Sequence, residues 1–545
     1  MSLPQAVDVL VAGSGAAGLT AALAAAVAGS GVLLVERGEQ LGGTSALSSG
    51  RVWVPGNHLQ HGDSLAAGAK YLAGLYSGRY PEMTAAVLQS GPDMLRFVEQ
   101  HSAHRFAACP GYPDYDPGRA GATDGGRALD MMPIDTRQLT PLAAGILRPP
   151  GYLPMSFAEW DRWRYPDRFH WDLLHERDRT GVRANGMALV AGLLDGVVRA
   201  CVQVRTGTRL TGFRDGVAEL THDGQVTSVK VGAVILATGG FDWDQELRVI
   251  YQPAAQRASG APPTNTGDGL RIAADAGAAL DNLAEGWWMP MLAIPGETLL
   301  GEQFYRSLIR ERGLPRQIMV NAAGRRFVNE ALPYNEIGKA LHRELNHGEL
   351  NHGELNHGEL NHGELNHGQA GPVHLIFDEG YRARYPMPGV PGDGPVPDWV
   401  AHGRTLAQLA ARIGASTVAL AETVRRWNAS CAAGADPEFG RGEGAYQRFC
   451  GDPSVTPNPG LGPLDQPPFY AVEVLAGTIG TKGGPVTDTD GQVLRADGSP
   501  VPGLYAAGNV AAFWTADGYP GPGATLAAGM TMGYRAGRHA GRNVR

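Results

Sequence analysis

A strand, a glycine-rich turn, a helix and a second strand are expected within residues 7–36, and this order limits the folds open to the chain. Val7–Ala12 is an apolar run typical of a buried parallel strand. An alanine-rich helical pattern follows over Leu19–Ala28, and a second apolar run, Val32–Val35, ends in the acidic residue Glu36. This pattern predicts an α/β domain built on a parallel sheet.

The turn between strand and helix has the spacing Gly-x-Gly-x-x-Gly, formed by Gly13, Gly15 and Gly18. The first glycine permits a tight turn, the second lets backbone N–H groups approach a pyrophosphate, and the third lets helix and strand pack closely. The start of the helix adds unpaired N–H groups and a partial positive charge. Glu36 can accept hydrogen bonds from ribose hydroxyls. The pattern therefore predicts a dinucleotide site, for NAD(P) or FAD.

Three later segments favour FAD. Residues 42–45 (GGTS), 231–240 (VGAVILATGG) and 504–509 (LYAAGN) resemble, in this order, the signatures of glutathione-reductase-like flavoproteins. No second Gly-x-Gly-x-x-Gly follows a strand, so we expect no NADPH domain. Ser45–Gly50 contains no histidine, the residue that binds flavin covalently in succinate dehydrogenases, so we expect non-covalent FAD. The predicted FAD-binding residues are Gly13, Ser14, Gly15, Ala16, Ala17, Gly18, Glu36, Arg37, Gly42, Gly43, Thr44, Ser45, Ser49, Gly50, Thr238, Gly239, Gly240, Gly508, Asn509, Ala524, Thr525 and Leu526.

Composition and charge disfavour several classes of protein. The 545 residues carry a formal net charge of −8, which disfavours nucleic-acid binding. No apolar run is long enough to span a membrane, and the N-terminus lacks the pattern of a signal peptide. The cysteines are scattered, with no CxxC pair, as expected for free thiols in the cytoplasm (Cys109, Cys201, Cys431, Cys450).

We expect two domains. The FAD-binding domain, Rossmann-like and of the glutathione-reductase type, takes residues 1–281 and 468–545, with Phe469–Leu475 returning to it. An inserted α+β capping domain that carries catalytic residues takes residues 282–467. Within it the sequence predicts a hairpin of Ile318–Val320 with Arg326–Val328 and one amphipathic helix over Leu406–Ser430.

Five tandem copies of ELNHG fill residues 344–368. On an α-helix a period of five makes no constant apolar stripe, and the repeated glycine and asparagine lower helix propensity. The repeated histidines could bind a metal, but we interpret the segment as a lengthened surface connection, with no metal site and no catalytic role.

Residues 517–530 (DGYPGPGATLAAGM) suggest the chemistry. A glycine–proline turn leads into a helix that begins at Ala524. The phenol of Tyr519 and the backbone N–H of Gly523 could converge on one oxygen and form an oxyanion hole. This segment, together with residues 112–115 (YPDY), 325–334 (RRFVNEALPY) and 480–484 (GTKGG), resembles the 3-ketosteroid Δ1-dehydrogenases, which belong with the fumarate-reductase-like flavoproteins.

This resemblance implies roles for individual residues. Tyr519 and Gly523 would hold the ketone oxygen of a cyclic ketone, and Tyr334 would remove the proton α to the carbonyl. Tyr115 would hydrogen-bond to Tyr334, with Tyr112 as the weaker candidate for that role. Flavin N5 would take the hydride from the neighbouring carbon, and an external acceptor such as a quinone would reoxidise the flavin.

The sequence leaves alternatives open. Leu526–Gly529 and Gly56–His61 depart from the pattern of the steroid enzymes, so a smaller cyclic ketone rivals a steroid as substrate. A fumarate-reductase-type enzyme would need arginine and histidine clustered at the flavin. A non-catalytic flavoprotein whose histidine repeat binds a metal or a partner is the third hypothesis.

Overall fold

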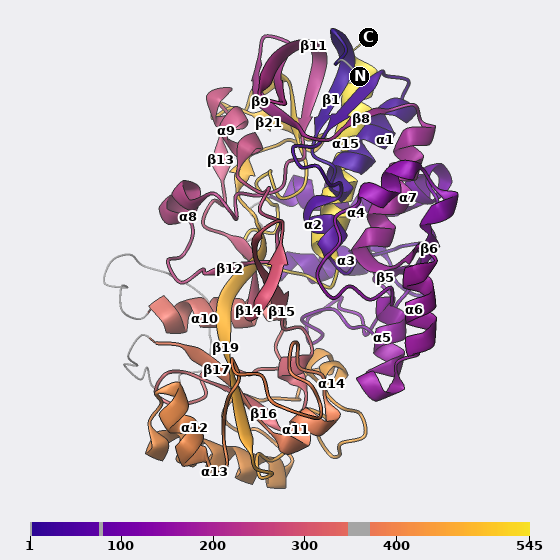
Figure 1. The fold of residues 1–545 in the computed structure, drawn as a ribbon. Helices are drawn as coiled ribbons and strands as arrows, with labels where there is room; N and C mark the ends of the chain where they lie inside the picture. Colours follow the sequence, from indigo (N-terminus) through magenta and orange to yellow (C-terminus); the bar gives the residue numbers. More distant parts are fainter. Residues whose placement is uncertain (1–2, 76–79, 347–370, 545) are drawn as a thin grey trace.

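The computed structural model describes residues 3–75, 80–346 and 371–544. Two sheets organise the chain, one in the upper half of Figure 1 and one in the lower half. The two ends of the chain lie close together at the top of the view. The ELNHG repeat, which is predicted to be a lengthened surface connection, lies outside the described residues except at its start.

The upper sheet is the predicted parallel sheet. Its strands run in the order β8, β2, β1, β11, β22, all parallel, and β21 joins its edge in the antiparallel direction. Their bounds are β1 (Ala6–Ala12), β2 (Val32–Val35), β8 (Gln203–Arg205), β11 (Gln225–Leu236), β21 (Gln492–Leu494) and β22 (Pro500–Ala506). β9 (Thr208–Arg214) and β10 (Val217–His222) form an antiparallel meander with β11.

Three helices lie together beside this sheet: α1 (Ala16–Val27), α7 (Asn185–Arg199) and α15 (Ala524–Asn543). Glycines let α15 lie directly on α1. A Cβ on Gly533 would stand 2.3 Å from the carbonyl oxygen of Ala17, and one on Gly537 would stand 2.2 Å from that of Ala21. This packing brings the start of α15 beside the start of α1, where the glycine turn lies.

The lower sheet is mainly antiparallel, in the order β15, β14, β19, β17, β16. The short strands β12 and β18 also pair with β19. The bounds are β12 (Ala258–Ser259), β14 (Gly286–Leu299), β15 (Glu302–Ser307), β16 (Gln317–Val320), β17 (Val373–Asp378), β18 (Ala401–Gly403) and β19 (Phe469–Thr481). α10 (Tyr334–Asn346) lies against β14 and begins at the tyrosine where the sequence predicts a helix start.

Three local predictions are wrong. Phe469–Leu475 belongs to β19 of the lower sheet, because it pairs with β17 and β14. Arg326–Val328 forms no strand, because the buried guanidinium of Arg326 pairs with Glu330 and Asp436. The helix predicted over Leu406–Ser430 is interrupted at Gly414, which is left-handed at φ 72°, so α12 (Leu406–Ile413) and α13 (Thr417–Ala433) are separate.

The remaining α-helices and β-strands complete the two halves: α2 (Gly43–Leu47), β3 (Val52–Trp53), α3 (Leu65–Ala73), α4 (Pro81–His101), β4 (Phe106–Ala108), β5 (Ala128–Met131), β6 (Ile134–Asp135), α5 (Phe157–Trp163), α6 (Trp171–Arg179), β7 (Val182–Arg183), α8 (Gln245–Tyr251), α9 (Asp268–Asp275), β13 (Leu280–Asp281), α11 (Glu379–Arg384), α14 (Ala445–Cys450) and β20 (Gly484–Pro485).

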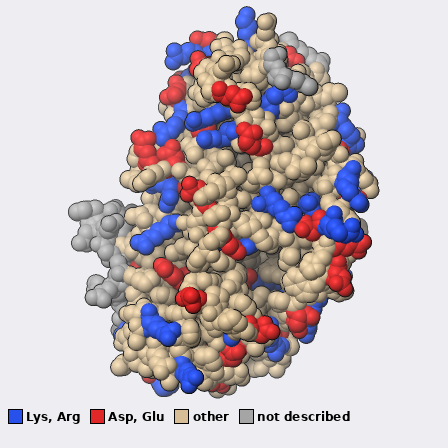
Figure 2. All heavy atoms as spheres, in the orientation of Figure 1, with Lys and Arg blue, Asp and Glu red and all other residues tan. Residues whose placement is uncertain are grey.

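Acidic and basic side chains are interspersed over the face seen in Figure 2. Within the described ranges, no helix has both the length and the apolar character needed to cross a bilayer. The same residues contain no group of three or more His, Cys, Asp or Glu side chains placed to hold a metal ion. All four cysteines are free thiols.

Candidate active site

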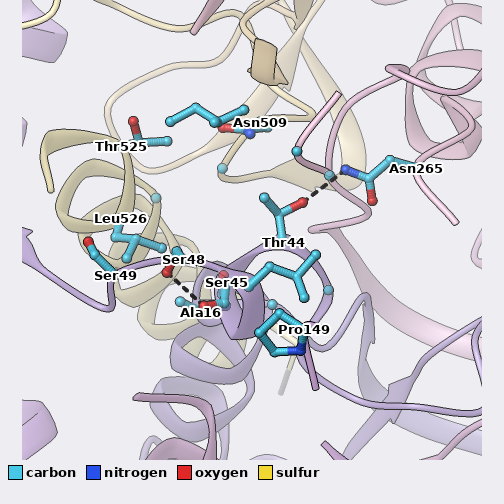
Figure 3. Close-up of a pocket in the computed structure, with 18 of the residues that line it drawn as sticks. Ala16, Thr44, Ser45, Ser48, Ser49, Pro149, Asn265, Asn509, Thr525 and Leu526 are labelled. Atoms are coloured by element: carbon cyan, nitrogen blue, oxygen red, sulfur yellow. Dashed lines mark hydrogen bonds between the residues drawn. The ribbon is translucent and has the colours of Figure 1, made fainter. Parts of the chain in front are cut away.

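A cavity of about 520 Å³ runs between the upper and lower sheets. One part of its wall is the glycine turn before α1, and another part carries tyrosines from three separate segments of the chain. Figure 3 shows the part nearest α1 and α2, with Ala16, Ser45 and Thr44 on one side and Asn509 and Thr525 on another.

The glycine turn has no room for side chains at two of its positions. A Cβ on Gly13, whose φ is +110°, would lie 2.2 Å from the carbonyl oxygen of Ala237, and one on Gly18 would lie 2.0 Å from the carbonyl oxygen of Gly13. Gly15 has a φ of −67° and lines the cavity, with the nearest atom to an added Cβ 3.4 Å away. The turn thus packs on one side and presents backbone to the cavity on the other.

Polar contacts hold the loops around this turn. The Glu36 carboxylate accepts hydrogen bonds from the Ser14 backbone N–H (3.0 Å) and hydroxyl (2.7 Å). The Ser45 hydroxyl accepts one from the Ala16 N–H at 2.9 Å. Asn265 donates to Thr44 at 3.2 Å, a hydrogen bond drawn as a dashed line in Figure 3. These contacts fix α2 and the turn before α9 against the start of α1.

The structure brings most of the predicted FAD-binding residues together on this cavity. Those that line it are Gly13, Ser14, Gly15, Ala16, Ala17, Glu36, Arg37, Gly43, Thr44, Ser45, Ser49, Thr238, Gly239, Gly508, Asn509, Thr525 and Leu526. Five others lie behind the wall instead: Gly18, Gly42, Gly50, Gly240 and Ala524. A Cβ on Gly240 would stand 2.2 Å from the Thr481 hydroxyl and one on Gly50 2.5 Å from the Asn185 carbonyl carbon, so these glycines allow close packing.

Tyr115, Tyr334 and Tyr519 meet at the tyrosine-bearing part of the wall. The Tyr334 hydroxyl donates a 2.6 Å hydrogen bond to the Tyr519 hydroxyl, which also accepts one from Thr525 at 3.2 Å. The Tyr115 ring stands edge-on to both, with centroid distances of 5.5 Å to Tyr334 and 5.2 Å to Tyr519. The Tyr112 ring packs against Arg51 and Phe449, and its phenol lies near enough to raise the pKa of Tyr115 and Tyr334.

Gly523 completes this wall. It precedes α15 as its N-cap at φ +94°, and a Cβ there would lie 2.5 Å from the carbonyl oxygen of Arg51. It lines the cavity four residues after Tyr519. The positive end of a 20-residue helix therefore begins beside the tyrosine cluster.

Burial is the largest influence on the pKa values of the three tyrosines. It raises the pKa of all three phenols, and those of Tyr115 and Tyr334 rise well above the ordinary value. The proximity of Tyr519 raises the pKa of Tyr334 further, whereas a hydrogen bond with the Tyr115 side chain acts in the opposite direction. The neighbouring tyrosines thus favour the neutral phenol in Tyr115 and Tyr334, whereas hydrogen bonds partly offset the effect of burial, from Tyr115 at Tyr334 and from Tyr334 and Thr525 at Tyr519.

A buried lysine supports Tyr519 from behind the wall. The Lys482 ammonium donates hydrogen bonds to the carbonyl oxygens of Ala516 (2.7 Å) and Gly518 (2.8 Å) and lies 4.0 Å from the Trp287 ring centroid. The Trp287 ring in turn lies 4.6 Å from that of Tyr519. Burial lowers the pKa of Lys482 to about 7.

Comparisons with known proteins agree with this geometry. Residues 8–526 match the family model described as FAD binding domain. The chain belongs to this FAD-binding family. It is 39% identical to 4-oxocyclohexanecarboxylate 2-dehydrogenase of Sinomonas cyclohexanicum, over 97% of this chain and 92% of the relative. It is 36% identical to 3-oxosteroid 1-dehydrogenase of Mycobacterium tuberculosis, over 98% of both chains.

A solved structure resembles the fold closely. The 3-ketosteroid Δ1-dehydrogenase of Sterolibacterium denitrificans, in complex with 1,4-androstadiene-3,17-dione, superposes with a TM-score of 0.89 at 33% identity, covering 99% of this chain and 100% of the other. The resemblance drawn from the sequence and the predicted α/β flavoprotein fold are therefore confirmed, as is FAD as the cofactor.

The residues of this FAD-binding chain fit the cofactor on physical grounds. The Thr238 hydroxyl lines the cavity and is buried without a hydrogen-bond partner in the described chain. A bound ligand would supply that partner. The backbone of Gly13–Ala17 and the start of α1 suit a pyrophosphate. Arg37 also lines the cavity, but its guanidinium pairs with Asp268 at 3.2 Å.

Sequence reasoning missed a large part of this cavity. The β14–β15 hairpin and the segment that follows it contribute Phe304, Tyr305 and Ile309, and the loop before α5 contributes residues 149–153 and 155. Arg51, Phe157 and Trp160 line it as well. Arg51 directly follows the predicted FAD loop, and an arginine in an otherwise apolar stretch is a signal that could have identified it.

Proposed function

We propose that this FAD-binding protein is a dehydrogenase that introduces a carbon–carbon double bond next to the carbonyl of a cyclic ketone. The cluster of Tyr115, Tyr334 and Tyr519 on the wall of the FAD cavity is the observation that supports this most directly. Relatives named for cyclic-ketone dehydrogenation, which align over nearly the whole chain, support it independently.

In this proposal Tyr519 and Gly523 bind the ketone oxygen. While Tyr334 is neutral, the Tyr519 hydroxyl accepts hydrogen bonds from Tyr334 and Thr525, so its own proton is available to donate to a carbonyl. In the reacting state Tyr519 keeps the Thr525 contact and donates to the ketone, while the Tyr334 phenolate accepts from Tyr115. The Gly523 N–H sits at the start of α15, where the helix dipole favours negative charge. Donors aimed at the developing enolate oxygen are worth roughly 3–4 kcal/mol each in other enzymes.

Tyr334 then takes the proton α to the carbonyl. Its raised pKa keeps Tyr334 protonated near neutral pH, and a protonated phenol cannot accept a proton, so two features must favour the transfer. Polarisation of the ketone by Tyr519 and Gly523 acidifies the α-hydrogen, and the Tyr115 hydrogen bond favours the Tyr334 phenolate. FAD is a two-electron oxidant, so when bound it would accept the hydride that leaves the neighbouring carbon.

We further propose an external electron acceptor, such as a quinone, and a cytoplasmic location, which the four free thiols suit. The fumarate-reductase alternative asks for histidine at the flavin, and none of the described residues that line the cavity is a histidine. The substrate is either a steroid or a smaller cyclic ketone such as an oxocyclohexanecarboxylate, the two classes named for the relatives.

The test is anaerobic mixing of the FAD-loaded protein with androst-4-ene-3,17-dione, cyclohexanone, 4-oxocyclohexanecarboxylate or succinate, each separately, while flavin absorbance is followed. We expect a ketone to bleach the flavin and succinate to leave it oxidised. Bleaching by succinate alone, or by none of the ketones including 4-oxocyclohexanecarboxylate, would overturn the proposal.

A further inference from the structure

We propose that Arg51 binds a carboxylate of the substrate, so that the site takes a small cyclic keto acid and not a steroid. This inference rests on the proposed function, and it concerns a side chain to which neither FAD binding nor the tyrosine chemistry assigns a role.

Arg51 is held firmly in the wall of the cavity. Its side chain is 2% exposed, and its guanidinium carbon lies 4.5 Å from the Tyr112 ring centroid and 4.2 Å from that of Phe157. Both rings line the same cavity. Two aromatic faces therefore fix the plane of the guanidinium, which is the preorganisation that paired hydrogen bonding to a carboxylate requires.

The Arg51 guanidinium has an N–H donor without an acceptor in the described chain. Its Nη2 donates to Asp161 at 3.0 Å, while its Nε is buried with no hydrogen-bond partner in the described chain. Asp161 is shared, because its other oxygen lies 2.6 Å from Nη2 of Arg310. The nearby Asp130 carboxylate accepts from the N–H groups of Met131 and Ala158. Arg51 is thus only partly paired, and a buried donor without a partner is costly unless a ligand fills the role.

Arg51 also stands in a suitable place relative to the expected ketone site. Its own carbonyl oxygen is the atom that a Cβ on Gly523 would meet at 2.5 Å. Its guanidinium lies against the Tyr112 ring, and the Tyr446 ring contacts both Tyr112 and Tyr115, at centroid distances of 6.3 Å and 5.1 Å. The ketone-binding groups and the cation are therefore at different positions along one wall, as a ring with its ketone and carboxylate on opposite carbons demands.

A steroid makes poor use of this arrangement. Its fused hydrocarbon rings carry no charge, and apolar surface placed against a partly paired guanidinium would leave the free donor unsatisfied. A carboxylate supplies acceptors to Nε and its neighbours. Two relatives named for oxocyclohexane- and oxocyclohexenecarboxylates, at 39% and 33% identity, are consistent with such a substrate.

The experiment compares 4-oxocyclohexanecarboxylate with its methyl ester, which keeps ring and ketone but removes the charge, and includes androst-4-ene-3,17-dione. We expect kcat/KM for anaerobic flavin reduction in the wild type to be about 100-fold higher for the acid, the usual cost of losing one partner of a buried charge pair. In Arg51→Met we expect the acid to lose that advantage while the ester stays within about threefold, a split that simple structural damage would not produce.

Two results overturn the inference: a wild type that uses acid and ester equally well, or one that prefers the steroid. The wild-type comparison decides even if Arg51→Met fails to fold. If no ketone reduces the flavin, the proposed function itself fails; if the ester or the steroid does so as well as the acid, only the assignment of Arg51 fails.

Discussion

The phenol oxygens of Tyr334 and Tyr519 lie 2.6 Å apart, although 185 residues separate them in the sequence. Tyr334 begins α10, which packs against the lower sheet, and Tyr519 lies in the turn before α15, which packs against the upper one. The hydrogen bond therefore joins the two halves of the molecule at the cavity wall. It also places the proposed base and the proposed ketone donor close enough to act on the α-carbon and the carbonyl oxygen of one ketone.

Tyr519→Phe removes the proposed ketone donor and keeps the ring that packs against Trp287. We expect the rate of anaerobic flavin reduction to fall roughly 10²–10³-fold, as for other oxyanion-hole donors, with FAD content unchanged. Stopped-flow absorbance measures the rate. Tyr505→Phe is the matched control, since its hydroxyl bonds to His539 and does not line the cavity. Equal rates in Tyr519→Phe and wild type would remove Tyr519 from the mechanism.

Tyr115→Phe tests the tuning of the base. Burial raises the pKa of Tyr334, and the hydrogen bond with Tyr115 lowers it, so the loss of that bond raises this pKa further. A general base must be deprotonated, so kcat/KM should rise with pH, and the variant should need a higher pH for the same value. The measurement is the pH profile of kcat/KM in both proteins. A shift toward lower pH would contradict the role given to Tyr115.

Gly15→Ala and Gly13→Ala separate cofactor binding from folding. Gly15 has a φ of −67° and space for a methyl group, but that group would stand in the cavity where the pyrophosphate is expected. We expect Gly15→Ala to fold with an unchanged Tm as apoprotein and to bind FAD at least tenfold more weakly, by fluorescence titration. Gly13→Ala should lower the Tm, because φ +110° and a 2.2 Å contact with Ala237 strain the turn. Normal FAD affinity in Gly15→Ala would contradict this assignment.

The sequence prediction was correct for elements whose formation depends on residues close together in the sequence. The two apolar runs are β1 and β2, and the helix expected to begin at Ala524 is α15. The prediction failed where a partner lies far along the chain: Arg326 pairs with Asp436, 110 residues away, and not with a strand neighbour. β19 reads as an apolar run that suits either sheet, and only its pairing with β17 decides.

The residues of the candidate site likewise fall into a part that sequence motifs predicted and a part that they did not. Glycine spacing and the turn at Tyr519 pointed to the cofactor and tyrosine walls, because those motifs are contiguous in sequence. The hairpin strand that contributes Phe304 has no motif, since any apolar side chain of suitable size could fill that position. Gly414, by contrast, was a readable helix stop within an otherwise periodic pattern.

Lys482→Met tests the support behind Tyr519. The methionine keeps the length of the side chain but leaves the carbonyl oxygens of Ala516 and Gly518 without their donor, at a cost of ~1–3 kcal/mol each. We expect a lower Tm and flavin reduction slowed about tenfold or more, because the turn that positions Tyr519 loosens. Calorimetry and stopped-flow absorbance measure the two effects, with exposed Lys70→Met as control. Unaltered reduction kinetics would show that Lys482 does not position Tyr519.

Acid should destabilise the protein through buried histidines, of which His104 is the clearest. Burial lowers the pKa of His104 from 6.5 to about 4, while its ring nitrogens contact the Ser102 hydroxyl and the Leu189 carbonyl oxygen. Between these pH values the unfolded chain binds a proton that the folded chain does not, so stability falls as pH falls from about 6.5 to about 4.

The loss from His104 alone is on the order of 3 kcal/mol across this range. We expect His104→Gln to be less stable than wild type at pH 7.5 but to lose less stability on acidification, because glutamine does not titrate. Thermal unfolding of both FAD-loaded proteins at a series of pH values measures this difference. Parallel losses in the two proteins would show that His104 does not link protonation to unfolding, and would leave His342 and His374, whose pKa values burial also lowers to about 4, as the groups to substitute next.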